Sequence, residues 1–167
     1  NSIGLYTIVR REVSRFIRIW SQTLLPSVVT MALYFVIFGN VIGSRIGEIA
    51  GFSYIEYIVP GLIMMAIITN SYGNVVASFF SSKFQRNIEE MLVSPLPNFI
   101  IIWGYLLGGL ARGVTVGILV TGVSLFFVVL PIAHIGVVFF VGILTAILFS
   151  LAGLINGIFA KSFDALY

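Results

Sequence analysis

Charged residues are scarce in this sequence, which has only nine Lys or Arg and six Asp or Glu among 167 residues, or 9%. A soluble protein carries about 25%, so this chain has too few charges to cover a surface that faces water. Apolar residues make up 59% of the chain, and the mean hydropathy is +1.12. These values exclude a soluble domain, and they also exclude disorder, which requires low hydrophobicity. The composition is that of an integral membrane protein.

Cysteine is absent and histidine occurs once, at His134. Without cysteine the chain has no disulfides, thiolate metal ligands or Cys nucleophiles. One histidine cannot build a zinc site or a histidine relay, so we expect no metal. A net charge of +3 gives no support for nucleic-acid binding. The long apolar runs contain no His, Asp, Glu or Cys to activate a serine, so we expect no catalytic residues.

Four long apolar runs predict an all-α, polytopic membrane protein. Three runs are uncharged, at 24–42, 57–80 and 135–160, and a fourth, 99–130, is interrupted only by Arg112. As helices rising about 1.5 Å per residue, all four can cross a hydrocarbon core of about 30 Å. Helices are expected because the backbone must satisfy its own hydrogen bonds in lipid. The alternation of a transmembrane strand is not visible.

Basic residues lie mainly on one side of these spans. Seven of them fall in the N-terminal segment, the loop after the second span and the C-terminal tail: Arg10, Arg11, Arg15, Arg18, Lys83, Arg86 and Lys161. On the other side, the 43–56 loop has only Arg45. Cytoplasmic loops carry the excess of Lys and Arg, so we expect both ends of this chain in the cytoplasm.

Residues 3–20 are predicted to form an amphipathic helix that lies in the membrane interface before the first span. At about 100° per residue, its apolar side chains share one face and its arginines the opposite one. The apolar face has Tyr6, Val9, Val13, Phe16 and Trp20, and the basic face has Arg11, Arg15 and Arg18. We expect the arginines to face phosphates or solvent. The helix would be either a simple lipid anchor or a seat for a cytosolic partner.

The loop between the second and third spans, 82–97, is predicted to hold a short amphipathic helix. Arg86 stands three and four residues before Glu89 and Glu90, a spacing that favours ion pairs on a helix. Pro95 ends the helix, because proline disfavours the helical conformation in the residue before it. One face collects the apolar side chains Phe84, Ile88, Met91 and Leu92. Charges at a membrane edge often only solvate the chain, and that alternative stays open on the loop alone.

Together with two further stretches, this loop resembles the membrane subunit of type 2 ABC transporters, closest to the bacterial inner-membrane permeases. The stretches are 59–65, VPGLIMM, and 151–161, LAGLINGIFAK. The resemblance runs along essentially all of the chain, and it implies six spans in the full-length family, of which four lie here. It implies that 3–20 is an interfacial connecting helix. It also implies a coupling helix that docks on a nucleotide-binding subunit, formed by Gln85, Arg86, Asn87, Ile88, Glu89, Glu90, Met91 and Leu92.

The resemblance implies the permease subunit of an exporter in the bacterial inner membrane, working by alternating access. ATP and Mg²⁺ are expected on a partner ATPase subunit, because 157–162, GIFAKS, has Ala160 where a phosphate loop needs glycine before its lysine. We therefore expect no enzyme activity and no cofactor on this chain. Its expected partners are that ATPase, membrane lipid and a second permease copy, with which it is expected to form a homodimer. The sequence does not distinguish among drugs, glycans, lipids and heme-like cargo as the substrate.

Polar residues inside the spans are candidates for the substrate pathway. Thr30 and Tyr34 share a face of the first span, and Asn70, Asn74 and Ser78 share a face of the second. Buried amides at this depth need a partner or a wet cavity, so bonds between helices are the alternative.

Arg112, the only charge inside a span, either reaches the cytoplasmic boundary or has a functional role, pairing with an acid or lining a cavity. Glycines repeat every fourth residue at Gly109, Gly113 and Gly117 and at Gly153 and Gly157, which predicts close helix packing within one subunit or at a dimer seam.

Two other functions fit the composition. An ion-coupled secondary transporter is disfavoured, because such proteins usually place carboxylates at membrane depth and these spans have none. A non-transporting membrane assembly protein would also have few charges and glycine-rich helix faces. The 82–97 loop distinguishes it from the exporter, since only a coupling helix must bind an ATPase.

Overall fold

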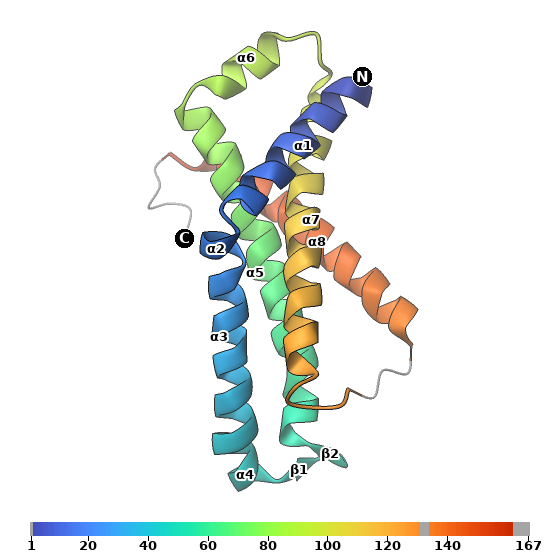
Figure 1. Ribbon diagram of the computed structural model, residues 1–167. Coiled ribbons are helices and arrows are strands. Elements are labelled where there is room, and N and C mark those ends of the chain that lie inside the picture. Colours follow the sequence, from blue (N-terminus) through green and yellow to red (C-terminus); the bar gives the residue numbers. More distant parts are fainter. Residues whose placement is uncertain (1, 131–133, 162–167) are drawn as a thin grey trace.

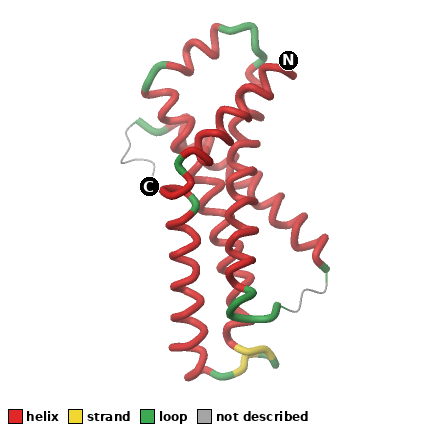
Figure 2. Tube along the Cα trace, viewed as in Figure 1, coloured by secondary structure: helices red, strands yellow, loops and turns green. Residues whose placement is uncertain are grey.

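The computed structural model describes residues 2–130 and 134–161, and these are largely helical (Figures 1 and 2). The elements in chain order are α1 (Ser2–Arg18), α2 (Trp20–Thr23), α3 (Leu25–Val36), a π-helical segment (Ile37–Ile42), α4 (Gly43–Ile46), β1 (Glu48–Ile49), β2 (Phe52–Ser53), α5 (Tyr54–Phe84), α6 (Asn87–Val93), α7 (Asn98–Ser124) and α8 (Ile135–Phe159). Four helical stretches are long and apolar enough to cross a membrane: Trp20–Ile46, α5, α7 and α8. The predicted all-α polytopic fold is confirmed.

The second span is longer than the uncharged run that predicted it. The run 57–80 lies between Glu56 and the Ser81–Ser82 pair that precedes Lys83, whereas α5 covers Tyr54–Phe84. Glu56 belongs to the first turn of the helix, where its Oε2 accepts a hydrogen bond from the backbone N–H of Ser53 at 2.9 Å. This bond is part of a capping box, which starts a helix rather than ending one.

The third span is shorter than its apolar run. The sequence predicts 99–130, but α7 ends at Ser124, whose hydroxyl donates to the carbonyl of Thr121 at 2.7 Å. The apolar residues that follow leave the helix and pack against the first span, where the rings of Phe127 and Phe35 lie 5.8 Å apart. Hydropathy cannot separate a helix from an apolar loop that follows it, and Phe126 and Val129 of this loop are 89% and 83% exposed. The predicted boundary was therefore wrong.

Helix α5 is the centre of the bundle, with α7 and α8 packed against it (Figure 1). Glycines make the close approach feasible. A Cβ atom at Gly109 of α7 would lie 3.1 Å from the carbonyl oxygen of Ser71, and one at Gly153 of α8 would lie 2.7 Å from that of Tyr72. The glycine repeats therefore serve packing within this subunit, as predicted. Gly113, Gly117 and Gly157 also face α5 side chains.

The bundle has two distinct ends (Figure 1). One carries α6 and the start of α1, and we refer to it as the α6 end. The other carries the β1–β2 hairpin, in which Glu48 pairs with Ser53 and Ile49 with Phe52. The turn between these strands passes through residues with positive φ, Ala50 and Gly51. Residues from α1, α2 and the tips of α5 and α7 gather at the α6 end.

Candidate functional site

Helix α6 projects at the tip of α5, joined to it by a two-residue turn (Figure 1). Helix α5 continues through Phe84, and the short helix predicted within the 82–97 loop covers Asn87–Val93. Arg86 forms the turn with a left-handed backbone, φ 60° and ψ 8°. At the other end, Ser94 takes an extended conformation before Pro95, as the proline predicts.

One face of α6 is fixed to the bundle. Ile88 and Met91 are half-buried and pack against a cluster that includes Ile8 of α1 and Tyr105 of α7. The remaining side chains of the predicted coupling helix are exposed, namely Gln85, Arg86, Asn87, Glu89, Glu90 and Leu92. The helix thus has an exposed outer face with two acidic residues and an apolar inner face that packs against the bundle. Phe84 and Leu92, which the sequence placed with Ile88 and Met91, are 70% and 56% exposed.

The predicted ion pairs of Arg86 with Glu89 and Glu90 are not formed. In the described part of the chain, the ion pairs are those of Arg11 and Arg15 with Glu12. Arg86 lies outside α6 in a left-handed turn, so the helical spacing that would stack it on the two glutamates does not apply. Both carboxylates are therefore left available on the surface.

The most buried charge in the described chain is Glu12 of α1, which is 1% exposed. Its Oε2 accepts hydrogen bonds from Ser78 of α5 at 2.6 Å and from Arg15 at 3.1 Å. Its Oε1 lies 3.5 Å from a guanidinium nitrogen of Arg11. A buried charge is tolerated only when it is paired and hydrogen-bonded, and here both conditions hold. Glu12 therefore fixes α1 against α5.

The two arginines extend this network to other helices. Arg15 also donates to the side-chain oxygen of Asn74 on α5 at 3.0 Å, and Arg11 donates to the hydroxyl of Tyr105 on α7 at 3.1 Å. The Tyr105 hydroxyl donates in turn to Ser82 at 2.9 Å. A continuous set of polar contacts thus joins α1, α5 and α7 beside the base of α6. We refer to these residues, with Glu12 and Ser78, as the Glu12 network.

The predicted faces of α1 need correction. Its buried side is formed by Ile8, Glu12 and Phe16, while Tyr6 and Trp20 are 64% and 57% exposed. The three arginines of the predicted basic face do not all turn outward: the side chains of Arg11 and Arg15 bond within the protein, whereas that of Arg18 makes none of the described bonds. The reason is that Gly104 and Gly108 of α7 let α1 approach closely, against Ile8 and Glu12.

Lys83 joins the tip of α5 to the end of α8. Its ammonium group donates to the carbonyl oxygens of Ile158 at 2.7 Å and Ala160 at 3.0 Å. The last carbonyls of a helix have no partner within it, and a lysine near them is favoured by the helix dipole. The end of α8 is therefore tied to the segment that carries α6.

The predicted pathway residues separate into two groups. Asn74 and Ser78 belong to the Glu12 network. Thr30, Tyr34 and Asn70 instead line a groove of about 270 Å³ between α3 and α5. There the Asn70 oxygen accepts a bond from Ser27 at 3.1 Å and its amide donates to the carbonyl of Ala66 at 2.9 Å. Most of these polar groups thus join helices, the alternative that the sequence left open.

Arg112 lies near the middle of α7, at the level where the first span begins. Its Nη2 is 3.5 Å from the carbonyl oxygen of Thr23 in α2. The half of α7 before it, including Gly104 and Gly108, runs beside α1. This position is compatible with the boundary interpretation of Arg112, because the preceding half of α7 runs beside α1, the helix expected in the membrane interface.

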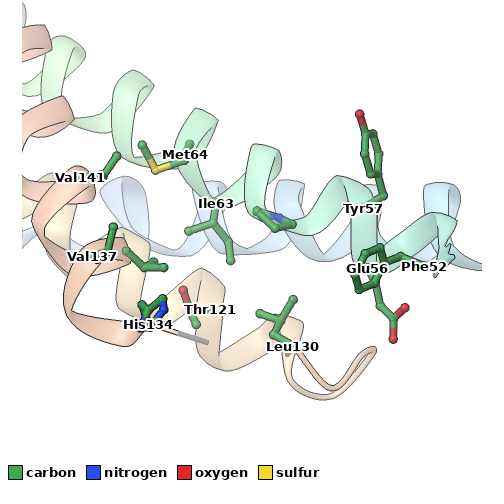
Figure 3. Close-up of a pocket in the computed structure, with 12 residues that line it drawn as sticks. Phe52, Glu56, Tyr57, Ile63, Met64, Thr121, Leu130, His134, Val137 and Val141 are labelled. Carbon is green, nitrogen blue, oxygen red and sulfur yellow. The ribbon is translucent and has the colours of Figure 1, made fainter. Parts of the chain in front are cut away.

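A second, largely apolar cavity of about 670 Å³ lies toward the hairpin end, between α5, the end of α7 and the start of α8 (Figure 3). Ile63 and Met64 of α5 and Val137 and Val141 of α8 line it. His134 is exposed and also lines this cavity.

Comparison with known proteins identifies the chain's relatives. A sequence model described as "ABC-2 type transporter" matches residues 4–167. The chain belongs to the ABC-2 type transporter family. It is 61% identical over 162 residues to proteins named "Inner membrane transport permease YadH" from Escherichia coli K12 and from Shigella flexneri. The match covers 97% of this chain and 63% of each relative, so the chain spans less than two thirds of their length. No solved structure is significantly similar to it.

Sequence reasoning missed Glu12 in this ABC-2 chain. Glu12 stands between Arg11 and Val13 in a segment whose arginines predict an interfacial helix. A single acidic residue among basic residues was therefore expected to be a surface charge. A usable signal was its spacing. Ile8, Glu12 and Phe16 recur every four residues and so share one helix face, and a carboxylate in line with two large apolar side chains is buried with them.

Proposed function

We propose that this protein is the permease subunit of an ABC exporter in the bacterial inner membrane, which moves its substrate by alternating access. Membership of the ABC-2 family and the permease name of its relatives support this proposal. The subunit itself is not an enzyme. ATP and Mg²⁺ act on a separate ATPase subunit, and a second permease copy completes the pathway.

The observation that carries the proposal is the construction of α6. Its inner face, Ile88 and Met91, is packed against α1 and α7, while Glu89 and Glu90 are exposed at its outer face. A partner that pushes on this outer surface moves a body already fixed to two other helices. A loop that is only solvated would not require an inner face packed against two other helices.

Through the Glu12 network, the proposed motion of α6 would be transmitted to the spans. A displacement of α6 acts directly on the tip of α5 and, through the contact of Ile88 and Met91 with the α1–α7 cluster, on both neighbours. Glu12 and Arg15 hold α1 to α5, so these helices move together. The excess of basic residues at the α6 end favours placing it in the cytoplasm, where ATP is available.

Substrate contacts are proposed for the groove between α3 and α5. Thr30, Tyr34 and Asn70 line it, and its depth in the bundle suits a molecule with both polar and apolar parts. Arg112 does not line this groove, and it acts at the membrane boundary instead.

Co-purification with the ATPase tests the proposed function. The full-length permease is expressed with candidate ATP-binding subunits, and the amount of ATPase recovered is measured. We expect Glu89→Lys with Glu90→Lys to reduce this recovery at least about tenfold, because two pairs of opposite charges become like-charge contacts, each of which costs several kcal/mol. Glu89→Lys alone should reduce recovery to a smaller extent. Its matched control is Glu48→Lys, a reversal of another exposed glutamate at the hairpin end, which should leave recovery unchanged.

Failure of any ATP-binding subunit to co-purify with the wild-type protein would contradict the exporter proposal and favour an assembly protein. A complex that forms equally well with both glutamates reversed would reject α6 as the acidic docking surface.

A further inference from the structure

A polar cavity of about 550 Å³ opens at the α6 end, between α1 and the last turns of α5. Three arginines of α1 and three serines of α5 line it, namely Arg11, Arg15, Arg18, Ser78, Ser81 and Ser82. The amide side chains of Gln85 and Asn87 lie at its rim on the α6 side. Almost every lining side chain can donate a hydrogen bond, which is unusual for a protein with 9% charged residues.

The balance of charge in this cavity is positive. Glu12 is the one acidic residue that lines it, and the carboxylate already accepts bonds from Ser78, Arg15 and Arg11. One negative charge against three positive charges leaves two uncompensated. Among the described residues no acceptor binds Arg18, and the Nε of Arg15 is buried without a partner. The cavity therefore contains cationic hydrogen-bond donors, on Arg18 and Arg15, that have no acceptor among the described residues.

The cavity lies where the first candidate span begins and the second ends, which is where we expect the hydrocarbon of a bilayer to give way to its headgroups. Arg18 and Ile19 directly precede the first span, which begins at Trp20, and Ser81 and Ser82 lie in the last turn of the second span. The apolar side chains of Ile17 and Trp20 are 54% and 57% exposed next to it. Tryptophan at this position is typical of the membrane interface, and the apolar flank offers a surface to acyl chains.

We propose that this cavity binds the anionic phosphate of a lipid headgroup from the leaflet at the α6 end. Arginine is the side chain best suited to phosphate, because its planar guanidinium donates two parallel bonds. Arg18 supplies the main contact, and Ser81 and Gln85 add neutral donors. A lipid held here touches both α1 and the α5 tip that carries α6, so its phosphate stabilises their contact. This role is independent of whether α6 binds an ATPase.

Lipid titration of the purified full-length protein tests the proposal. Delipidated protein in detergent is titrated with phosphatidylglycerol or with phosphatidylcholine, and the bound lipids are counted by native mass spectrometry. We expect phosphatidylglycerol to bind more tightly, and Arg18→Glu to weaken its binding about tenfold, as expected for the loss of one charge-assisted hydrogen bond. Arg10→Glu is the matched control, since Arg10 is exposed on the same helix and lies outside the cavity. It should change binding less than about twofold.

A second arm separates a lipid phosphate from a free one. Inorganic phosphate at millimolar concentration should not displace the lipid. If inorganic phosphate displaces the lipid, and if this displacement also requires Arg18, the cavity binds phosphate. The proposal that the phosphate belongs to a lipid headgroup would then be overturned. Equal weakening by Arg10→Glu, or equal affinity for both lipids, rejects the site. Arg18→Gln removes the charge without reversing it, and it should weaken phosphatidylglycerol binding to a smaller extent than Arg18→Glu. Because this substitution is milder, it tests whether misfolding causes the loss of binding.

Discussion

Replacement of Glu12 with alanine should lower the free energy of unfolding by about 2–3 kcal/mol. Removing one partner of a buried ion pair costs about 3–5 kcal/mol, because the other charge is left unpaired. The loss is smaller here because the side chains of Arg11 and Arg15 are 45% and 37% exposed, so water can solvate both guanidinium groups. Ser78 also loses the acceptor that it reaches at 2.6 Å.

Thermal unfolding of the full-length protein in detergent measures this effect. Glu12→Ala should unfold at a clearly lower temperature than the wild type, and Glu12→Gln should fall between them because it keeps an acceptor oxygen and loses the charge. Glu90→Ala is the control, since Glu90 is exposed on α6 and its side chain makes none of the described hydrogen bonds or ion pairs. An unfolding temperature for Glu12→Ala equal to that of Glu90→Ala would show that the Glu12 network does not hold α1 in place.

A leucine at Gly153 should prevent the fourth span from packing. The Cβ atom that any substitution adds would lie 2.7 Å from the carbonyl oxygen of Tyr72, and a backbone atom in the middle of α5 cannot move aside as a side chain can. Overpacking costs about 1–3 kcal/mol in a well-packed core. Gly153→Ala should fall in that range, and Gly153→Leu should exceed it because its larger side chain must separate α8 from α5.

The yield of monodisperse full-length protein in size-exclusion chromatography measures the loss. Gly136→Leu is the matched control in the same helix, since a Cβ atom there meets nothing within 4 Å. We expect a normal yield for Gly136→Leu and little or no monodisperse protein for Gly153→Leu. Equal yields from both would contradict the close contact of α8 with α5.

The four spans were predictable because a segment that crosses a bilayer must be long enough to span it and apolar along its length. Length and apolar composition therefore located α5 and α8 without knowledge of their neighbours. The ends of the spans were less predictable, since they depend on individual contacts. Helix α5 continues past the apolar run to include Lys83, whose ammonium group bonds carbonyls of α8, and α7 ends at Ser124 although the sequence remains apolar beyond it.

The site at the α6 end was only partly predictable. Pro95 and the amphipathic pattern located α6, but the pairing of Arg86 with the glutamates failed because one left-handed residue lies outside any helical spacing rule. The burial of Glu12 depends on Gly108 of α7, nearly a hundred positions away, which admits its side chain. No local pattern in α1 contains that information.

The bonds of Lys83 bear on how force passes to the last span. Lysine is a flexible chain of four carbons, so its bonds to the carbonyls of Ile158 and Ala160 resist separation of the two helix ends more than their approach. A pull on α6 away from the membrane would therefore load the end of α8 through Lys83, in addition to the packing of α8 along α5.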